Sequence, residues 1–543
     1  MISIQKFNQL DFLFCIKKLL LVFWARSLIL FLHLLFFSPM SFADSYSLES
    51  ELYKNNESKI TQIVQSLSVE QKVGQLFIFG FTGQTMTPHL TTLLSNYSPG
   101  AVIVFKRNIK DLSSISTLNR DMQILSLKKS KIPLFIMVDQ EGGNVSRLIL
   151  HPRPPSAHSL GQSNNLTFAK YYGQLTGELL YLTGFNFNLA PVVDLSNPNV
   201  KNFIGSRSFG NDPHKVYRLA SEFSKGLLDY SVLPTFKHFP GHGNLKGDSH
   251  KITPIKSLSL NELLKLDLIP FSELAKDKIP AAIMTSHISF PKIDKSKLPA
   301  TYSKVILTEL LRQRLMYDGL IITDDLQMAG AKQVGSIGKR AIKAINAGSD
   351  MIMVAWSLKK QILAYKAVLD AVKKGEITED RLNQSLYRIL RIKMAQDRIK
   401  NFSSNALMAR ISKVQNEIKN LGQKIARLNL QSKFQTISNK IKISPSQKLH
   451  VFSADKGLFK LVQSHFRNSS QFHHLKRNTK IDVAKILYTD NSAIGVFYVS
   501  GEGTARILND LPLQIKKRVI VINSSYPGII NQAKFFGTFQ NEG

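Results

Sequence analysis

Eight short apolar runs, separated by segments with helical periodicity, constrain the fold more than any other feature of this sequence. Most of the runs are continuous apolar blocks and not strict alternations, as expected of strands that are buried on both faces. Segments between them, such as 304-KVILTELLRQRL-315, repeat apolar residues at the i, i+3, i+4 spacing of a helix. The runs occupy residues 75–81, 101–105, 134–139, 185–191, 232–239, 281–288, 318–325 and 350–356.

Two α/β architectures fit this alternation. Eight βα repeats between residues 60 and 400 predict a (β/α)8 TIM-type barrel. A doubly wound open sheet would show the same alternation. Polar residues at the ends of the runs favour the barrel, because the carboxyl ends of barrel strands converge on one mouth. These residues are Asp139, Asp194, Lys237, His238, His287 and Asp324.

The sequence continues beyond the expected barrel. A Lys-rich segment at 403–431 has helical periodicity, and three strand-like runs follow at 448–454, 494–501 and 518–525. The last α/β region is small and ends soon after a strand, so we expect it to be a short or truncated domain. The predicted organisation is an N-terminal targeting segment over 1–43, the catalytic barrel over 44–400, a helical connector over 401–446 and a small α/β domain over 447–543.

The composition excludes several kinds of site. Hydrophobic residues make up 43% of the 543 residues, which is enough for a full-sized core. The single cysteine, Cys15, lies in the N-terminal segment. Disulfides, thiolate metal sites and a cysteine nucleophile are therefore excluded from the rest of the chain.

The chain carries a formal net charge of +33. Such a charge attracts polyanions without specificity. The basic residues are spread along the chain and no nucleic-acid-binding motif accompanies them, so no nucleic-acid partner is expected. Two interpretations of the charge remain: a general richness in lysine, and contact with an anionic envelope surface.

The N-terminal segment has the features of a secretory signal peptide. Four basic residues, Lys6, Lys17, Lys18 and Arg26, precede the stretch 27-SLILFLHLLFFSPMSFA-43, which ends in the small-x-small cleavage pattern 41-SFA-43. The apolar run is short for a bilayer span, although the earlier stretch 19-LLLVFWA-25 could extend it into an uncleaved anchor. We expect an exported protein, periplasmic or membrane-anchored, with a cytoplasmic location as the alternative.

The stretch 237-KHFPGHGNLKGDSH-250 has the composition of a catalytic loop. Pro240 and the glycines exclude a continuous helix, which predicts a strand end followed by a long loop. Asp248 lies two residues before His250, and in a bent loop the carboxylate could hold the imidazole and raise its pKa. The imidazolium could then act as a general acid.

A zinc site is the alternative interpretation of the same histidines. His238, His242 and His250 could in principle ligate a metal, but their spacing matches no standard zinc pattern and no cysteine supports it. We expect neither a metal nor a cofactor. His242, which stands between two glycines, is expected to be a structural residue of the loop.

Three further motifs carry candidate site residues. In 321-IITDDLQMAG-330, Asp324 or Asp325 could be a nucleophile exposed at the end of a strand, while the other caps the following helix. In 138-VDQEGGNVSRL-148, Asp139 could accept hydrogen bonds from sugar hydroxyls and Arg147 could bind an acyl oxygen. Arg207, in 205-GSRSFG-210, is a weaker candidate on its own.

Taken together these motifs resemble those of glycoside hydrolase family 3, in its bacterial β-N-acetylglucosaminidase branch. The phrases DQEGG, GSRSFG, KHFPGHG, DSH and TDDL occur here in that family's order, over residues 60–400. The resemblance implies that Asp324 is the nucleophile, that His250 is the general acid and later the base, and that Asp248 is its partner. It also implies binding of the terminal N-acetylglucosamine (GlcNAc) by Asp139, Arg147, Arg207, Lys237 and His238.

The sequence departs from the family at Asn144 and at 244-NL-245, positions outside the expected catalytic groups. The expected activity is retaining exo-hydrolysis of terminal GlcNAc from peptidoglycan fragments or chitooligosaccharides. Two alternatives remain open. The same histidine would tolerate phosphate as the nucleophile, which would make a phosphorylase, and a barrel without turnover could be a wall-sugar-binding protein. The oligomeric state is left open.

Overall fold

The computed structural model describes residues 57–196, 203–243, 245, 253–396, 404–440, 448–453, 463, 470–474, 483–490, 492–499, 511–516, 519–523 and 537–540. The chain divides into two units, Met1–Lys59 and Ile60–Gly543. The predicted targeting segment, residues 1–43, lies outside the described residues. Within the described ranges, no helix combines the length and the apolar character that crossing a membrane requires.

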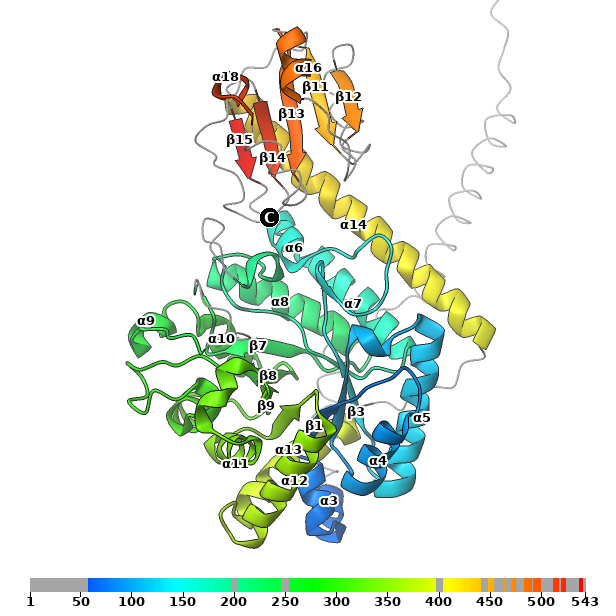
Figure 1. Ribbon diagram of the computed structural model, residues 1–543, viewed down its shortest axis with the longest axis vertical. Helices are drawn as coiled ribbons and strands as arrows, with labels where there is room; N and C mark the ends of the chain where they lie inside the picture. The colour runs from blue at the N-terminus through cyan, green and yellow to red at the C-terminus, as the bar shows by residue number, and fades with distance from the viewer. Residues whose placement is uncertain are drawn as a thin grey trace, which may run out of the picture. The chain divides into compact units, whose positions relative to one another are not determined.

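Eight parallel strands form a ring, and each lies within one of the eight predicted apolar runs (Figure 1). The strands follow one another in chain order, and the last pairs with the first. Between Phe187 and Leu233 a parallel bridge joins the two remaining edges. The strands therefore form the predicted closed barrel and not an open sheet. The strands are β1 (Phe77–Gly80), β2 (Ala101–Val104), β3 (Phe135–Val138), β6 (Phe187–Asn188), β7 (Thr235–Phe239), β8 (Ala282–Thr285), β9 (Leu320–Asp325) and β10 (Met351–Val354).

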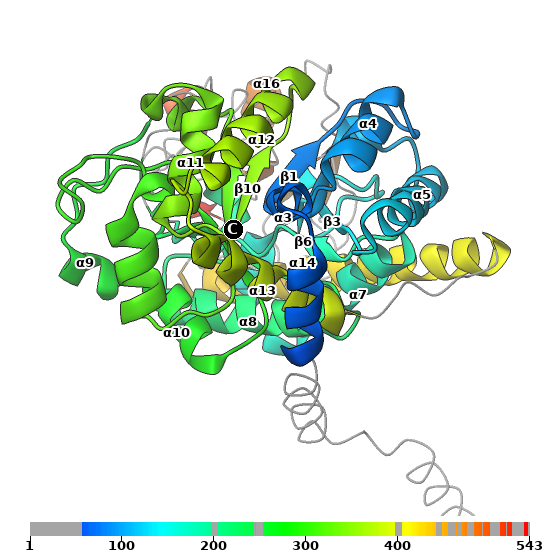
Figure 2. The same ribbon diagram turned by 90° about the horizontal axis from the view of Figure 1, so that it is seen from below.

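Helices surround the strands, as Figure 2 shows from below. Many helices begin after a residue whose side chain caps the first turn, and α8 (Pro213–Leu228) is an example: Asp212 is its N-cap, and Pro213, which favours the first helical position, follows it. Apolar residues on one side of each helix face the sheet and close the core. The helices are α3 (Val69–Gly74), α4 (Pro88–Tyr97), α5 (Leu112–Ser130), α6 (Ala157–Ser163), α7 (Leu166–Leu182), α8 (Pro213–Leu228), α9 (Leu260–Leu264), α10 (Ile269–Asp277), the π-helical η4 (Val305–Arg314), α11 (Ile337–Ala347), α12 (Leu358–Lys373) and α13 (Glu379–Ala395).

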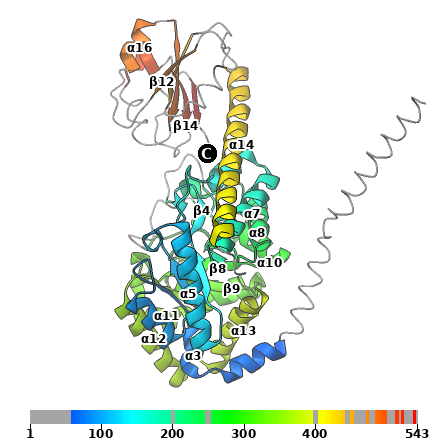
Figure 3. The same cartoon turned by 90° about the vertical axis from the view of Figure 1, so that its right-hand side faces the viewer.

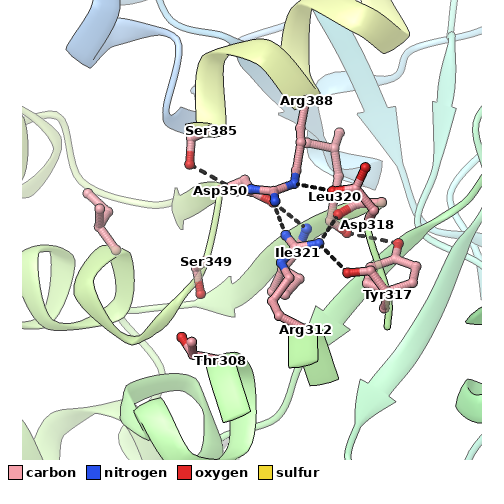
Figure 4. A network of polar contacts seen from close by, with 12 residues as sticks. Thr308, Arg312, Tyr317, Asp318, Leu320, Ile321, Ser349, Asp350, Ser385 and Arg388 are labelled. Carbon is pink, nitrogen blue, oxygen red and sulfur yellow. Dashed lines mark hydrogen bonds and ion pairs between the residues drawn. The ribbon is translucent and has the colours of Figure 1, made fainter. Parts of the chain in front are cut away.

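A buried ion-pair network ties the amino ends of β9 and β10 to the surrounding helices (Figure 4). Asp350 is fully buried and pairs with Arg312 of η4 and with Arg381 and Arg388 of α13. Its Oδ2 also accepts the backbone N–H of Ile321, at 2.9 Å. Since the carboxylate is surrounded by donors, the network stabilises the end of the barrel opposite the mouth.

The long helix α14 (Ser404–Lys440) packs against α6 and α7 of the barrel (Figure 3). Its apolar stripe is buried in the same core as those helices. Two polar contacts accompany the stripe: Arg410 pairs with Glu178 at 2.6 Å, and Asn429 donates to the carbonyl oxygen of Ser159 at 2.9 Å. The buried stripe consists of Ile411, Val414, Ile418, Leu421 and Ile425.

The described part of the C-terminal region contains a parallel five-stranded sheet. The strand order is β12-β11-β13-β14-β15, and the three predicted strand-like runs contain β11, β13 and β14. The elements are β11 (Leu449–Ser453), β12 (Ser470–His474), α16 (Val483–Thr489), β13 (Ile494–Val499), α18 (Leu513–Lys516), β14 (Val519–Asn523) and β15 (Gly537–Gln540).

Candidate active site

Asp139, Arg147 and Lys237 come together at the carboxyl end of the barrel, as predicted from their positions. Asp139 directly follows β3, and Lys237 lies in β7. The Lys237 ammonium donates to Oδ1 of Asp139 at 2.9 Å, and the Arg147 guanidinium donates to Oδ2 at 3.3 Å. Burial alone would raise the pKa of Asp139, but these two positive charges outweigh burial and hold it well below its usual range. Asp139 is therefore an ionised acceptor.

Glu141 is a site residue that the sequence analysis missed. Its carboxylate accepts two hydrogen bonds from the Arg207 guanidinium, both at 2.8 Å, and pairs with the Lys237 ammonium at 2.7 Å. Burial acts to raise the pKa of Glu141, and the charges of Arg207 and Lys237 lower it overall. The sequence held one indication of this role: Glu141 follows Asp139 by two residues, and alternate residues of an extended chain lie on the same face.

The glycines after Glu141 allow this segment to fold back on itself. Residues Gln140–Gly142 (β4) pair antiparallel with Val145–Ser146 (β5). Gly142 and Gly143 both have positive φ, of 95° and 54°. A Cβ on Gly142 would lie 2.2 Å from the carbonyl oxygen of Pro155, so only glycine fits there. The tight turn brings Arg147 back beside Asp139.

A second buried group joins β7 to the segment after β6. His238 Nδ1 lies 2.6 Å from Oδ2 of Asp194, and Oδ1 of Asp194 accepts the backbone N–H of His242 at 2.7 Å. Burial would raise the pKa of Asp194, but the neighbouring His238 lowers it below its usual range. Asp194 was predicted as a polar strand end but was given no role in the site. The structure shows that it orients the ring of His238.

His242 is buried and its pKa falls to about 4, chiefly because burial disfavours the charged imidazolium. It is therefore neutral near pH 7. Its ring packs 5.4 Å from that of His238, measured between centroids. This environment agrees with the structural role expected for His242.

Lys237 and His238 are adjacent in sequence, yet both side chains are buried among groups of the site. Ordinary strand alternation would send neighbouring side chains to opposite faces. The pairing of β7 with β8 shifts register between Lys237 and Phe239, an irregularity that breaks the alternation at this point. The shift falls where this strand end supplies two consecutive side chains to the site, and the peptide bond that joins them is cis.

The structure distinguishes the two aspartates at the end of β9. Asp325 is buried, and its Oδ1 accepts backbone N–H groups from Gln327 at 3.1 Å and Ala355 at 3.2 Å. Asp324 is only partly buried, and its Oδ1 accepts the backbone N–H of Asp325 at 2.7 Å. Asp325 thus ties β9 to the end of β10, while Asp324 is the more accessible carboxylate.

Burial also changes the protonation of Asp325. Burial raises the pKa of Asp325 to about 7, and the negative charge of Asp324 adds to this rise, while hydrogen bonds from Gln327 and Ala355 oppose it. A carboxyl group that is half protonated near neutrality is a poor permanent nucleophile. The local environment therefore favours Asp324 as the reactive group.

The predicted acid–base pair, Asp248 and His250, lies outside the described residues. The chain on either side of it is described. In the segment that follows it, Thr253 donates to the carbonyl oxygen of Gly330 at 2.9 Å, and Lys256 donates to the carbonyl oxygen of Gly241, which precedes the pair, at 3.1 Å. Within the described ranges, no group of three or more His, Cys, Asp or Glu side chains is placed to hold a metal ion.

Residues 68–392 match the model of the glycosyl hydrolase family 3 N terminal domain. A β-hexosaminidase from Photobacterium profundum is 37% identical over 264 residues, which cover 48% of this chain and 76% of that protein. Beta-hexosaminidase A from Pseudoalteromonas piscicida is 34% identical over 334 residues, 57% of this chain, and the match spans only 55% of that relative's length.

The structure is similar to that of a glycoside hydrolase family 3 β-N-acetylglucosaminidase from a Paenibacillus species. The TM-score is 0.71 at 26% sequence identity, and the match covers 88% of this chain and 94% of that one. The similarity therefore extends beyond the barrel that the family model covers.

Proposed function

The chain belongs to glycosyl hydrolase family 3, and on this basis we propose that it is a retaining exo-β-N-acetylglucosaminidase. The substrate would be a saccharide with GlcNAc at its non-reducing end. The names of its relatives, β-hexosaminidases and a β-N-acetylglucosaminidase, support this choice.

The observation that carries the proposal is the ionised cluster at the barrel mouth. Asp139 and Glu141 are held as carboxylates by Arg147, Arg207 and Lys237. Such a set of fixed donors and acceptors suits the hydroxyl and acetamido groups of one sugar ring. It lies on the same carboxyl end of the barrel as Asp324, where barrel enzymes place their chemistry.

In the proposed mechanism Asp324 attacks the anomeric carbon of the bound GlcNAc. The bond to the leaving oxygen breaks as that oxygen takes a proton from His250, and a covalent glycosyl-enzyme forms. Water then attacks the same carbon, gives its proton to His250, and releases Asp324 with overall retention. Asp248 would hold the imidazole of His250 in the required orientation.

The contacts within the site support the proposed binding roles. Asp139 would accept hydrogen bonds from sugar hydroxyls, with Lys237 and Arg147 as neighbouring donors. Arg207 and His238 would complete the pocket, each held by its own buried carboxylate. Because those carboxylates fix both side chains before substrate arrives, little conformational entropy would be lost on binding.

The natural substrate and location are part of the same proposal. Export by the N-terminal segment would bring the enzyme to peptidoglycan fragments or chitooligosaccharides outside the cytoplasm. The basic charge of the chain, +33, would favour the anionic surfaces found there. Cell fractionation with N-terminal sequencing tests the location: a mature chain that begins near Asp44 supports export, and a cytosolic chain that retains Met1 contradicts it.

Hydrolysis is tested with 4-nitrophenyl β-GlcNAc and the full chain. Asp324→Ala should reduce turnover by at least a thousandfold, and added azide should restore it with formation of the α-glycosyl azide. The first product of the unmodified enzyme, followed by NMR, should be the β-anomer. Equal turnover by the unmodified chain and Asp324→Ala would contradict the proposal.

The same assay in phosphate buffer separates hydrolysis from phosphorolysis. GlcNAc should remain the product at all phosphate concentrations. Accumulation of GlcNAc-1-phosphate would instead identify a phosphorylase. Saturable sugar binding with no turnover under either condition would identify a sugar-binding protein.

A further inference from the structure

The indole ring of Trp356 is an exposed aromatic surface at the mouth of the barrel. Trp356 follows β10 by two residues, and 55% of its surface is accessible to solvent. Tryptophan is on average one of the most buried residues, because its large apolar surface is unfavourable in water. A tryptophan kept this exposed next to a substrate site is a candidate for ligand contact.

The position of Trp356 is fixed relative to the proposed nucleophile. Its backbone N–H donates to Oε1 of Gln327 at 2.8 Å. The backbone N–H groups of Gln327 and Ala355 both donate to Oδ1 of Asp325, the residue after Asp324. One short network of hydrogen bonds therefore holds Trp356 beside the strand end that carries Asp324.

The ring itself is also held in place. Phe105, which follows β2, stacks on it with ring centroids 5.1 Å apart and an interplanar angle of 22°. The Arg107 guanidinium carbon lies 4.1 Å from the Trp356 ring centroid, and its Nη2 donates to the carbonyl oxygens of Phe81 and Ala355. Phe105 and Arg107 together fix the orientation of the indole, and the residue as a whole stays 55% exposed to solvent.

We propose that Trp356 is the platform for the first sugar on the leaving-group side of the cleaved bond. This rests on the proposed hydrolase function and deepens it. A pyranose ring carries C–H bonds on its face, which pack on an electron-rich aromatic surface while the hydroxyls stay in water. With GlcNAc held by Asp139, Arg147 and Lys237, the next sugar must lie outside that pocket, toward the rim where Trp356 stands.

Two glycosides, each of which releases an aliphatic alcohol on cleavage, test the proposed role of Trp356. GlcNAc-β-1,4-GlcNAc offers a pyranose to the ring, whereas methyl β-GlcNAc offers only a methyl group. Trp356→Ala should lower kcat/KM about tenfold for the disaccharide and less than twofold for the methyl glycoside. Trp356→Phe should retain most of the activity on the disaccharide.

Met316→Ala serves as the matched control. Met316 is 80% exposed and precedes β9, at the opposite end of the barrel, so its loss should affect neither substrate. Equal losses on both glycosides in Trp356→Ala would show that the ring acts on the catalytic centre and not on the leaving sugar. That result, or no loss on either, would overturn the proposal.

Tryptophan fluorescence tests the contact without turnover. The chain has two tryptophans, Trp24 and Trp356, so Trp24→Phe leaves Trp356 as the single reporter. In this chain with Asp324→Asn, the disaccharide should shift the emission to shorter wavelength, and free GlcNAc should not. If the unmodified enzyme cleaves neither glycoside, the proposed function fails and the leaving-group role fails with it, while a shift would still place the second sugar against the indole. An unchanged spectrum at saturating disaccharide would overturn the proposal.

Discussion

Glu141 offers the sharpest test of how the site is held together. Its side chain is 3% exposed, and it pairs with Arg207, 16% exposed, and Lys237, 2% exposed. Glu141→Gln keeps the shape but removes the charge that balances these two cations. Removing one partner of a buried ion pair costs about 3–5 kcal/mol, because the remaining charge is left without compensation.

We therefore expect Glu141→Gln to lower the free energy of unfolding by about 3–5 kcal/mol in chemical denaturation. Arg207 and Lys237 would also lose their fixed positions, so kcat/KM should fall by about tenfold to a hundredfold. The matched control is Glu222→Gln. Glu222 pairs with Lys225 at the same 2.7 Å that separates Glu141 from Lys237, but its side chain is 24% exposed and that of Lys225 is 33% exposed. Its loss should cost less than about 1 kcal/mol.

A double variant distinguishes the cost of an uncompensated buried charge from a general loss of packing. If the cost in Glu141→Leu arises from an uncompensated Arg207, then adding Arg207→Met should recover part of the lost stability. Strictly additive losses would refute this reasoning, and so would equal losses in Glu141→Gln and Glu222→Gln.

Three further predictions follow from other parts of the barrel. Burial raises the folded-state pKa of Asp325 to about 7, above an unfolded value near 4, so the stability that its protonation contributes is complete below about pH 4 and is lost as the pH rises to about 7. Asp325→Asn should remove this decline in the free energy of unfolding, which is about 4 kcal/mol at most. Chemical denaturation at several pH values checks this prediction. Asp350→Asn should lower the free energy of unfolding by about 3–5 kcal/mol. Asp318→Asn, at a side chain that is 66% exposed, should lower it by less than about 1 kcal/mol in the same assay. Similar losses in the two variants would contradict the importance of burial. Ile418→Asp should lower the melting temperature by several degrees by placing a charge in the core beneath α14, while the neighbouring exposed Lys419→Asp should not.

Local sequence patterns were sufficient to predict the strands of the barrel, but not β12 and β15 of the C-terminal sheet. Each strand of the barrel lies within a continuous apolar run, because a strand covered on both faces is apolar along its whole length. The same patterns could not distinguish a closed ring from an open sheet. That difference depends on contacts between distant segments, among them the bridges Phe187–Leu233 and Val192–Lys237.

The residues of the site also divide into those that the local sequence predicts and those that only tertiary contacts reveal. Asp139, Arg147 and Lys237 were predicted from strand ends and motifs, and the structure brings them into contact. Glu141 was overlooked because nothing local shows that Arg207, 66 positions later, folds back onto it. The roles of Asp248 and His250 stay predictions, since those residues lie outside the described ranges.

The sequence by itself determined which segments form the barrel strands and which residue types stand at the mouth, because hydrophobic periodicity and turn chemistry act over a few neighbours. Tertiary structure alone decided which charges are buried and with whom they pair. It also decided that Asp324 is accessible while Asp325 is buried. Burial and pairing set the energy of a charge, and both depend on residues that are far apart in the chain.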